Sequence, residues 1–205
     1  MMNRPRLGIF TLGAANRHSI EGALQRAGAA TSFVSEPSTI GSYDALVLPG
    51  VANFGYIAHE LDCKGLRDPL LDRVRAGVPL LGICAGYQLL FDSSEEAPQA
   101  RGLGIFHGAV RRLRTPRAPH MGWNSVTPRH DDRTIRPGWA YFANSYAPSD
   151  DVPNAIGTTC EGNESFASAA RKGAVWGVQF HPERSGAYGA SLLERFVRQA
   201  GSYAS

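Results

Sequence analysis

The chain has 205 residues, 43% of them hydrophobic, which suits a single globular domain spanning residues 1–205. Its net charge of +3 is too small to indicate nucleic-acid binding. No apolar run approaches the length of a membrane span, and the N-terminus lacks the long hydrophobic region of a secretion signal, so we expect a cytoplasmic protein with no membrane contact.

Short apolar runs alternate with amphipathic stretches along residues 6–91. The pattern predicts a strand at 6–10 and a helix at 19–30, with Ser19 as the expected N-cap. Strands at 31–34 and 44–50 follow, then a helical pattern across 56–76 that breaks at Lys64-Gly65. A uniformly apolar strand at 78–84 leads into helical spacing at 87–91. Such alternation predicts an α/β fold with an open, mainly parallel sheet flanked by helices.

The C-terminal half changes character, because its apolar runs are short, alternating and punctuated by Gly, Pro and Asn. These runs predict antiparallel strands and hairpins added to the sheet. They are GLGIF (102–106), GAVRRL (108–113), NSVTP (124–128), WAYFANSYA (139–147), AIGTT (155–159) and SFASAARKGAVWGVQF (165–180). An apolar stripe at Leu192, Leu193, Phe196 and Val197 predicts a closing helix near 189–200.

One basic cluster lies in RRLRTPRAP, at Arg111, Arg112, Arg114 and Arg117. We favour a solvated loop face, since charged side chains are mostly exposed. A docking or phosphate-facing patch is the alternative. The sequence does not separate the two.

Cys84 lies between the apolar strand and the following helix, with glycines at 82 and 86. G-x-C-x-G after a strand is the cysteine version of the nucleophile elbow, which projects its sulfur at the carboxyl end of a parallel strand. The following helix N-terminus favours a thiolate and offers N–H groups to an oxyanion. The pattern alone is equally compatible with a buried structural cysteine. Cys63 and Cys160 lack this setting. The sequence contains no CxxC pair that would indicate a zinc or redox site.

His181 and Glu183 supply the base and the orienting group that a thiolate nucleophile requires. His181 ends the apolar run GVQF, and Glu183 follows two residues later. At the end of a strand both side chains project from one edge, where the carboxylate holds the imidazole tautomer. Combined with the elbow, this pair predicts a triad of Cys84, His181 and Glu183.

GICAGYQ followed far downstream by HPE resembles the triad-type class-I glutamine amidotransferases, which use Cys, His and Glu in that chain order. Other segments resemble, in order and spacing, the glutaminase subunits of imidazole glycerol phosphate synthase. They are LPGVANFG (48–55), DSSEE (92–96), PHMGWN (119–124), YFANSYAP (141–148) and GVQFHPERSG (177–186). PHMGWN is the most specific, and the resemblance covers nearly the whole chain. It implies a flavodoxin-like α/β fold and a glutaminase that needs no cofactor or metal.

The resemblance also implies residue roles. Cys84 would attack the side-chain amide of glutamine, with His181 as base and acid and Glu183 orienting it. Oxyanion donors would lie at Gly50, Val51 and Ala85. Positions matched to substrate binding are Ala52, Gln88, Glu96, Ser145 and Tyr146. Positions matched to the docking face for a (β/α)₈ cyclase subunit are His120, Met121, Trp123, Asn124 and Arg184. In such a heterodimer, ammonia passes to the cyclase, which makes imidazole glycerol phosphate and an aminoimidazole carboxamide ribotide in histidine biosynthesis.

Three departures from the family pattern stand out. Ala52 replaces the second glycine of PGVG, where glycine leaves the backbone free to flip. GAANRHS (13–19) replaces GNL-x-S and keeps only Asn16 and Ser19, and Asn144 replaces a histidine. These departures leave two alternatives: a paralogous amidotransferase that supplies another synthase, in surface-sugar or secondary metabolism, and a catalytically silent regulatory subunit. The intact triad argues against the silent subunit.

Overall fold

The computed structural model describes residues 4–13, 17–115, 118–129 and 132–203. The strands of its large sheet are β1 (Arg6–Phe10), β2 (Ala30–Val34), β3 (Ala45–Gly50), β4 (Leu80–Cys84), β7 (His120–Pro128), β8 (Gly138–Asn144), β10 (Ala155–Glu161), β11 (Glu164–Lys172) and β12 (Val175–Val178). A three-stranded sheet contains β5 (Ser93–Ser94), β6 (Ala109–Arg112) and β9 (Tyr146–Pro148). The helices are α1 (Arg17–Arg26), α2 (Phe54–Cys63), α3 (Arg67–Arg75), α4 (Ala85–Gln88) and α5 (Gly186–Tyr203), with 3₁₀ turns η1 (Pro37–Ser42) and η2 (Pro182–Arg184).

The large sheet runs in the order β2-β1-β3-β4-β12-β11-β10-β7-β8. Neighbouring strands pair in parallel along the part of this order from β2 through β1, β3 and β4 to β12. In the rest of the sheet, from β12 through β11, β10 and β7 to β8, neighbouring strands pair antiparallel. The predicted α/β sheet with antiparallel strands from the C-terminal half is therefore confirmed. One topological detail differs, because β12 pairs in parallel with β4 instead of belonging wholly to the hairpins.

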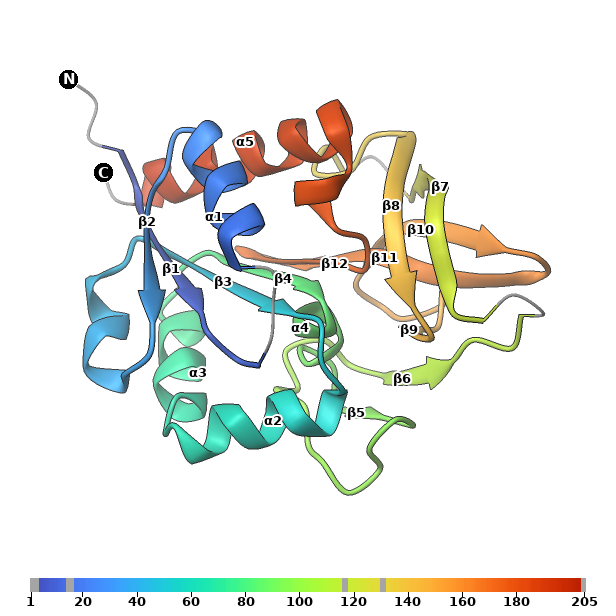
Figure 1. Ribbon diagram of the computed structural model, residues 1–205, viewed down its shortest axis with the longest axis horizontal. Coiled ribbons are helices and arrows are strands. Elements are labelled where there is room, and N and C mark those ends of the chain that lie inside the picture. The colour runs from blue at the N-terminus through green and yellow to red at the C-terminus, as the bar shows by residue number, and fades with distance from the viewer. Residues whose placement is uncertain (1–3, 14–16, 116–117, 130–131, 204–205) are drawn as a thin grey trace.

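Helices cover both faces of the parallel half of the sheet (Figure 1). On one face, α1 and α5 pack on the odd-numbered side chains of β3, such as Val47, and on Leu81 and Ile83 of β4. On the other face, α2 and α3 pack on Leu46 and Leu48. Successive strand residues point to opposite faces, so uniformly apolar strands supply both cores at once.

Several predicted boundaries shift. Ser19 lies within α1 instead of capping it, and the helix ends at Arg26 rather than at residue 30. Gly28, with φ of +101°, reverses the chain, and Ala30 already pairs in β2. The break at Lys64-Gly65 is confirmed, since α2 ends at Cys63 and Gly65 has φ of +62°. GLGIF (102–106) forms no strand, and the closing helix extends from Gly186 to Tyr203.

Candidate active site

Cys84 occupies the strained turn that the elbow motif predicts. It ends β4 with φ of +54° and ψ of −115°, and within the described ranges no other non-glycine residue has a positive φ. Both flanking glycines are required by close backbone contacts. A Cβ at Gly86 would lie 1.8 Å from the carbonyl oxygen of Leu48, and one at Gly82 would lie 2.9 Å from the Cα of Tyr87. Such strain is typical of functional positions, so the turn favours a reactive thiol over a structural one.

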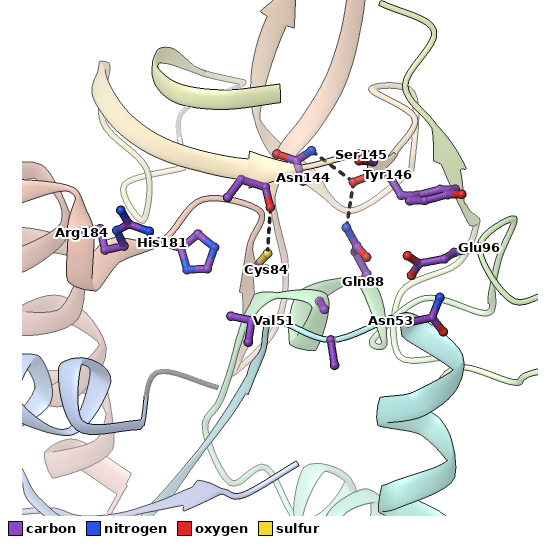
Figure 2. Close-up of a pocket in the computed structure, with 13 residues that line it drawn as sticks. Val51, Asn53, Cys84, Gln88, Glu96, Asn144, Ser145, Tyr146, His181 and Arg184 are labelled. Atoms are coloured by element: carbon purple, nitrogen blue, oxygen red, sulfur yellow. Dashed lines mark hydrogen bonds between the residues drawn. The ribbon is translucent and has the colours of Figure 1, made fainter. Parts of the chain in front are cut away.

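His181 and Glu183 form a buried pair beside this turn. Nδ1 of His181 lies 2.9 Å from Oε1 of Glu183, and their side chains are only 7% and 3% exposed. Figure 2 shows the imidazole next to the Cys84 sulfur. Burial lowers the pKa of His181, but hydrogen bonds to Cys84 and Glu183, together with their charges, outweigh burial and raise that pKa to about 10. The arrangement favours a charged imidazolium at His181 beside the Cys84 sulfur.

The geometry of this pair differs from the predicted strand end. β12 ends at Val178, and His181 precedes the 3₁₀ turn η2, whose first residue is Pro182. The turn, not a shared strand edge, brings Glu183 back to the imidazole. Parallel pairing of β4 with β12, with Ile83 opposite Val178, then places the turn beside Cys84.

Cys84 lies in the wall of a pocket of about 440 Å³, whose side chains are drawn in Figure 2. Its lining residues are Val51, Ala52, Asn53, Cys84, Ala85, Gln88, Glu96, Ala143, Asn144, Ser145, Tyr146, His181 and Arg184. All residues predicted for substrate binding therefore surround one cavity. Gly50 lies just outside this lining and pairs with Cys84 between β3 and β4. Sequence reasoning gave no site role to Asn53, Ala143 and Asn144, although Asn53 follows Ala52 and Asn144 precedes Ser145.

Polar side chains at one end of the pocket are held in place by backbone groups. Oε2 of Glu96 accepts the Phe54 N–H at the start of α2 at 2.7 Å. Nε2 of Gln88 donates to the carbonyl of Tyr146 at 2.8 Å and to Oε1 of Gln179 at 3.1 Å. Gln179 is fully buried and its Nε2 lies 3.8 Å from the Cys84 sulfur. Sequence reasoning passed over Gln179, although a polar residue inside the apolar run GVQF was the available signal.

Strands β7 and β8 present an apolar surface next to the pocket, which we call the hairpin face and define by Met121, Trp123, Trp139 and Tyr141. Met121, Trp123 and Trp139 are 65%, 54% and 61% exposed. Trp123 pairs with Tyr141 across the two strands, and directly paired residues point to the same side. The Arg184 guanidinium lies 4.0 Å from the centre of the Tyr141 ring. Sequence reasoning missed Trp139, which the alternation along β8 could have identified.

His120 and Asn124 do not lie on the hairpin face, which corrects their predicted position. Alternate residues of a strand point to opposite sides, so both side chains turn away from Met121 and Trp123. His120 is 3% exposed between Phe142 and Phe166, and burial lowers its pKa despite the nearby charge of Glu161. Asn124 donates to the carbonyl of Cys160 at 2.9 Å. Their surroundings are those of structural residues.

Arg111, Arg112 and Arg114 are exposed, as expected for a solvated face, but Arg111 and Arg112 lie on strand β6 and not in the predicted loop. Arg117 and Asn16 lie outside the described residues. Among the residues that are described, no group of three or more His, Cys, Asp or Glu side chains is arranged to hold a metal ion. None of the helices within those ranges has both the length and the apolar character of a membrane span.

Comparison with known proteins gives a match over nearly the whole chain. Residues 12–200 match the family model described as glutamine amidotransferase class-I. The imidazole glycerol phosphate synthase subunit HisH of Deinococcus radiodurans is 40% identical over 202 residues, covering 95% of this chain and 94% of that protein. Imidazole glycerol phosphate synthase hisHF of Arabidopsis thaliana is 40% identical over 197 residues, which are 92% of this chain and 33% of that protein. A crystal structure titled glutamine amidotransferase shares the fold, with a TM-score of 0.77 at 20% identity, over 96% of this chain and 98% of that one.

Proposed function

The chain belongs to the class-I glutamine amidotransferase family, and we propose that it is the glutaminase subunit of an imidazole glycerol phosphate synthase, with Cys84, His181 and Glu183 as its triad. The observation that carries the residue assignment is the buried His181–Glu183 pair, 2.9 Å apart, beside a cysteine held at positive φ. The relatives named HisH, matched over most of both chains, support the biosynthetic role.

The first half of the reaction forms a thioester. The Cys84 thiol gives its proton to His181, and the sulfur attacks the side-chain carbonyl carbon of glutamine. The carbonyl electrons move to oxygen, which receives N–H groups of Val51 and Ala85 in the oxyanion site. Ala85 suits this role because the first residue of a helix has no acceptor within the helix for its N–H. His181 then protonates the amide nitrogen, the C–N bond breaks, and ammonia leaves.

The second half restores the enzyme. His181, now neutral, takes a proton from water, and the oxygen attacks the thioester carbonyl carbon. The C–S bond breaks, the sulfur recovers a proton from His181, and glutamate leaves. Glutamine and water thus become glutamate and ammonia. Glu183 keeps the imidazole in one tautomer and stabilises its charged form throughout.

Glutamine carries both charges on its amino-acid end, so its site needs acceptors as well as donors. The Glu96 carboxylate lies in the pocket and suits the ammonium group. Both Gln88 amide protons point to Tyr146 and Gln179, which leaves its carbonyl oxygen to accept from the substrate. Ser145 and Tyr146 complete this end, and Ala52 forms the wall next to the oxyanion site.

We also propose that the hairpin face docks a (β/α)₈ cyclase subunit that uses the ammonia. Exposed tryptophans are typical anchors of protein–protein interfaces, and Ala143, opposite Met121, lines the pocket. A partner seated there covers the exit from Cys84. The unpaired cysteines suit the reducing cytoplasm, where such a biosynthetic enzyme would work.

Glutamate release tests the proposal. It is measured for the chain alone, with the histidine-pathway cyclase, and with that cyclase plus its ribonucleotide substrate. We expect weak activity alone, a large rise with partner and ligand, and loss of both in Cys84→Ala. Failure to form a stable complex with this cyclase would contradict the biosynthetic assignment even if glutaminase activity survives. Equal activities of wild type and Cys84→Ala under all conditions would contradict the catalytic assignment.

A further inference from the structure

Gln179 is a fully buried polar side chain in the centre of the site, and the two-step reaction above does not use it. It directly follows β12, and its backbone N–H donates to the carbonyl of Ser168 at 2.9 Å. Its side chain therefore enters the site from a fixed backbone. A buried amide costs free energy unless its donors and acceptors are paired. Either the carbonyl oxygen or the NH₂ group of this amide faces Cys84, and its hydrogen bonds decide which.

A chain of hydrogen bonds fixes the orientation of this amide. The carbonyl of Tyr146 can only accept, so the group of Gln88 that lies 2.8 Å from it must be the NH₂ group. The same NH₂ group lies 3.1 Å from the Gln179 side chain, which must therefore present its oxygen to Gln88. The NH₂ group of Gln179 then faces the Cys84 sulfur at 3.8 Å. The assignment depends on an obligatory acceptor and not on a choice between two similar amide atoms.

We propose that Gln179 is a further catalytic residue, whose amide N–H donates to the Cys84 sulfur and stabilises the thiolate from which the attack begins. The inference rests on Cys84 being the nucleophile, as proposed above. Three features support it: the amide touches the reacting atom, it is shielded from water, and its donor end is fixed by Gln88. Hydrogen bonds to a charged acceptor are stronger and shorter than neutral ones, so the long contact to a thiol tightens when the proton leaves.

The same contact gives Gln88 a second role as a positioning residue. It holds the substrate on one side and fixes the Gln179 amide on the other. Loss of Gln88 frees the amide of Gln179 to turn its oxygen toward the sulfur, which would disfavour the thiolate. The substrate pocket and the nucleophile are thereby linked through two amide groups.

The test measures the thiol itself and needs no turnover. Cys63 and Cys160 are exposed, so they are first replaced by serine. The rate of Cys84 alkylation by iodoacetamide is then followed against pH by intact mass, because only the thiolate reacts. We expect Gln179→Met to raise the midpoint of this profile by about one pH unit, as a hydrogen bond to a charged group predicts. Gln179→Glu, similar in size but unable to donate when ionised, should raise it further, and Gln88→Leu should raise it less.

Ser168→Ala is the matched control, because Ser168 is fully buried next to Gln179 and its hydroxyl has no hydrogen-bond partner among the described residues. Its midpoint should stay at the wild-type value. The inference is overturned if Gln179→Met and Gln179→Glu keep that value, or if Ser168→Ala shifts it equally. A variant that fails to fold is replaced in the comparison by the other Gln179 variant. A different result, with Cys84 reacting no faster than a free thiol in the wild-type background, would contradict the proposed nucleophile instead.

Discussion

The backbone of His181 is joined directly to that of Tyr141 on the hairpin face. The His181 N–H donates to the Tyr141 carbonyl at 2.9 Å. The Ser185 hydroxyl completes the connection, since it accepts the Tyr141 N–H at 3.0 Å and donates to the His181 carbonyl at 2.6 Å. The base of the proposed triad is therefore held by the strand that carries the exposed aromatic side chains.

Ser185→Ala should impair catalysis more than binding. Ser185 is 1% exposed, and its loss leaves the Tyr141 N–H and the His181 carbonyl without their shared partner. We expect kcat to fall about tenfold with little change in KM, and stability to fall by about 1–3 kcal/mol. Steady-state glutaminase kinetics and urea unfolding check both. Ser185→Thr, which keeps the hydroxyl, should recover part of kcat. Ser202→Ala, at an exposed position of α5, should change neither kcat nor stability. A rise in KM alone would contradict the positioning role.

Glu183→Gln should lower the pKa of His181 from about 10 toward the usual 6.5. A raised pKa in the folded state stabilises the protein fully below pH 6.5, and this contribution is lost as the pH rises toward 10. The free energy of unfolding of the wild type should therefore fall across this interval, and that of Glu183→Gln should fall less. Urea unfolding at several pH values measures the difference, and the nitrogen shifts of His181 report its pKa directly. Parallel curves for the two proteins would contradict the assignment.

Gly86→Ala should destabilise the protein by about 3 kcal/mol or prevent folding, because the new methyl group would overlap the Leu48 carbonyl. Backbone cannot move aside as a side chain can, and β3 and β4 are both central strands. Gly41→Ala is the control, since a Cβ there meets nothing within 4 Å and Gly41 has no positive φ. Thermal unfolding of the two variants checks the prediction. Equal melting temperatures would mean that the elbow relaxes more easily than its geometry indicates.

Trp123→Ala should weaken binding of the cyclase about 30-fold, which corresponds to about 2 kcal/mol for an interface anchor. Trp139→Ala should weaken cyclase binding by a smaller factor, because Trp139 lies on the edge strand β8. The glutaminase activity of the isolated chain should be unchanged in both, since neither side chain lines the pocket. Calorimetric titration measures the affinities. Tyr203→Ala removes an exposed aromatic side chain of α5 and should bind normally; an equal loss there would contradict the placement of the interface.

The sequence predicted the parts of the site that depend on local chain geometry. Cys84 between two glycines required a tight turn after a buried strand, and Glu183 lies close enough in sequence to His181 to meet it in almost any turn. Prediction from the sequence failed where the direction of a side chain depends on strand boundaries or on contacts between distant segments. PHMGWN gave no indication that His120 and Trp123 would face opposite sides, because the sequence predicted a strand only at 124–128, whereas β7 already begins at His120. Gln179 was missed because its importance comes from Gln88, 91 positions earlier.

The adjacency of β4 and β12 has a consequence for how such a chain can change. Everything between Leu89 and Ala174, including the hairpin face, is an excursion that leaves one strand and returns to its neighbour. Insertions or exchanges within the excursion that keep the backbone of Tyr141 in place leave Ile83 opposite Val178 and the His181 N–H bonded to the Tyr141 carbonyl, and therefore keep the cysteine and the histidine together. A graft of the β7–β8 hairpin from a relative would then be a modular exchange, which redirects the ammonia to a new recipient while the hydrolytic machinery is retained.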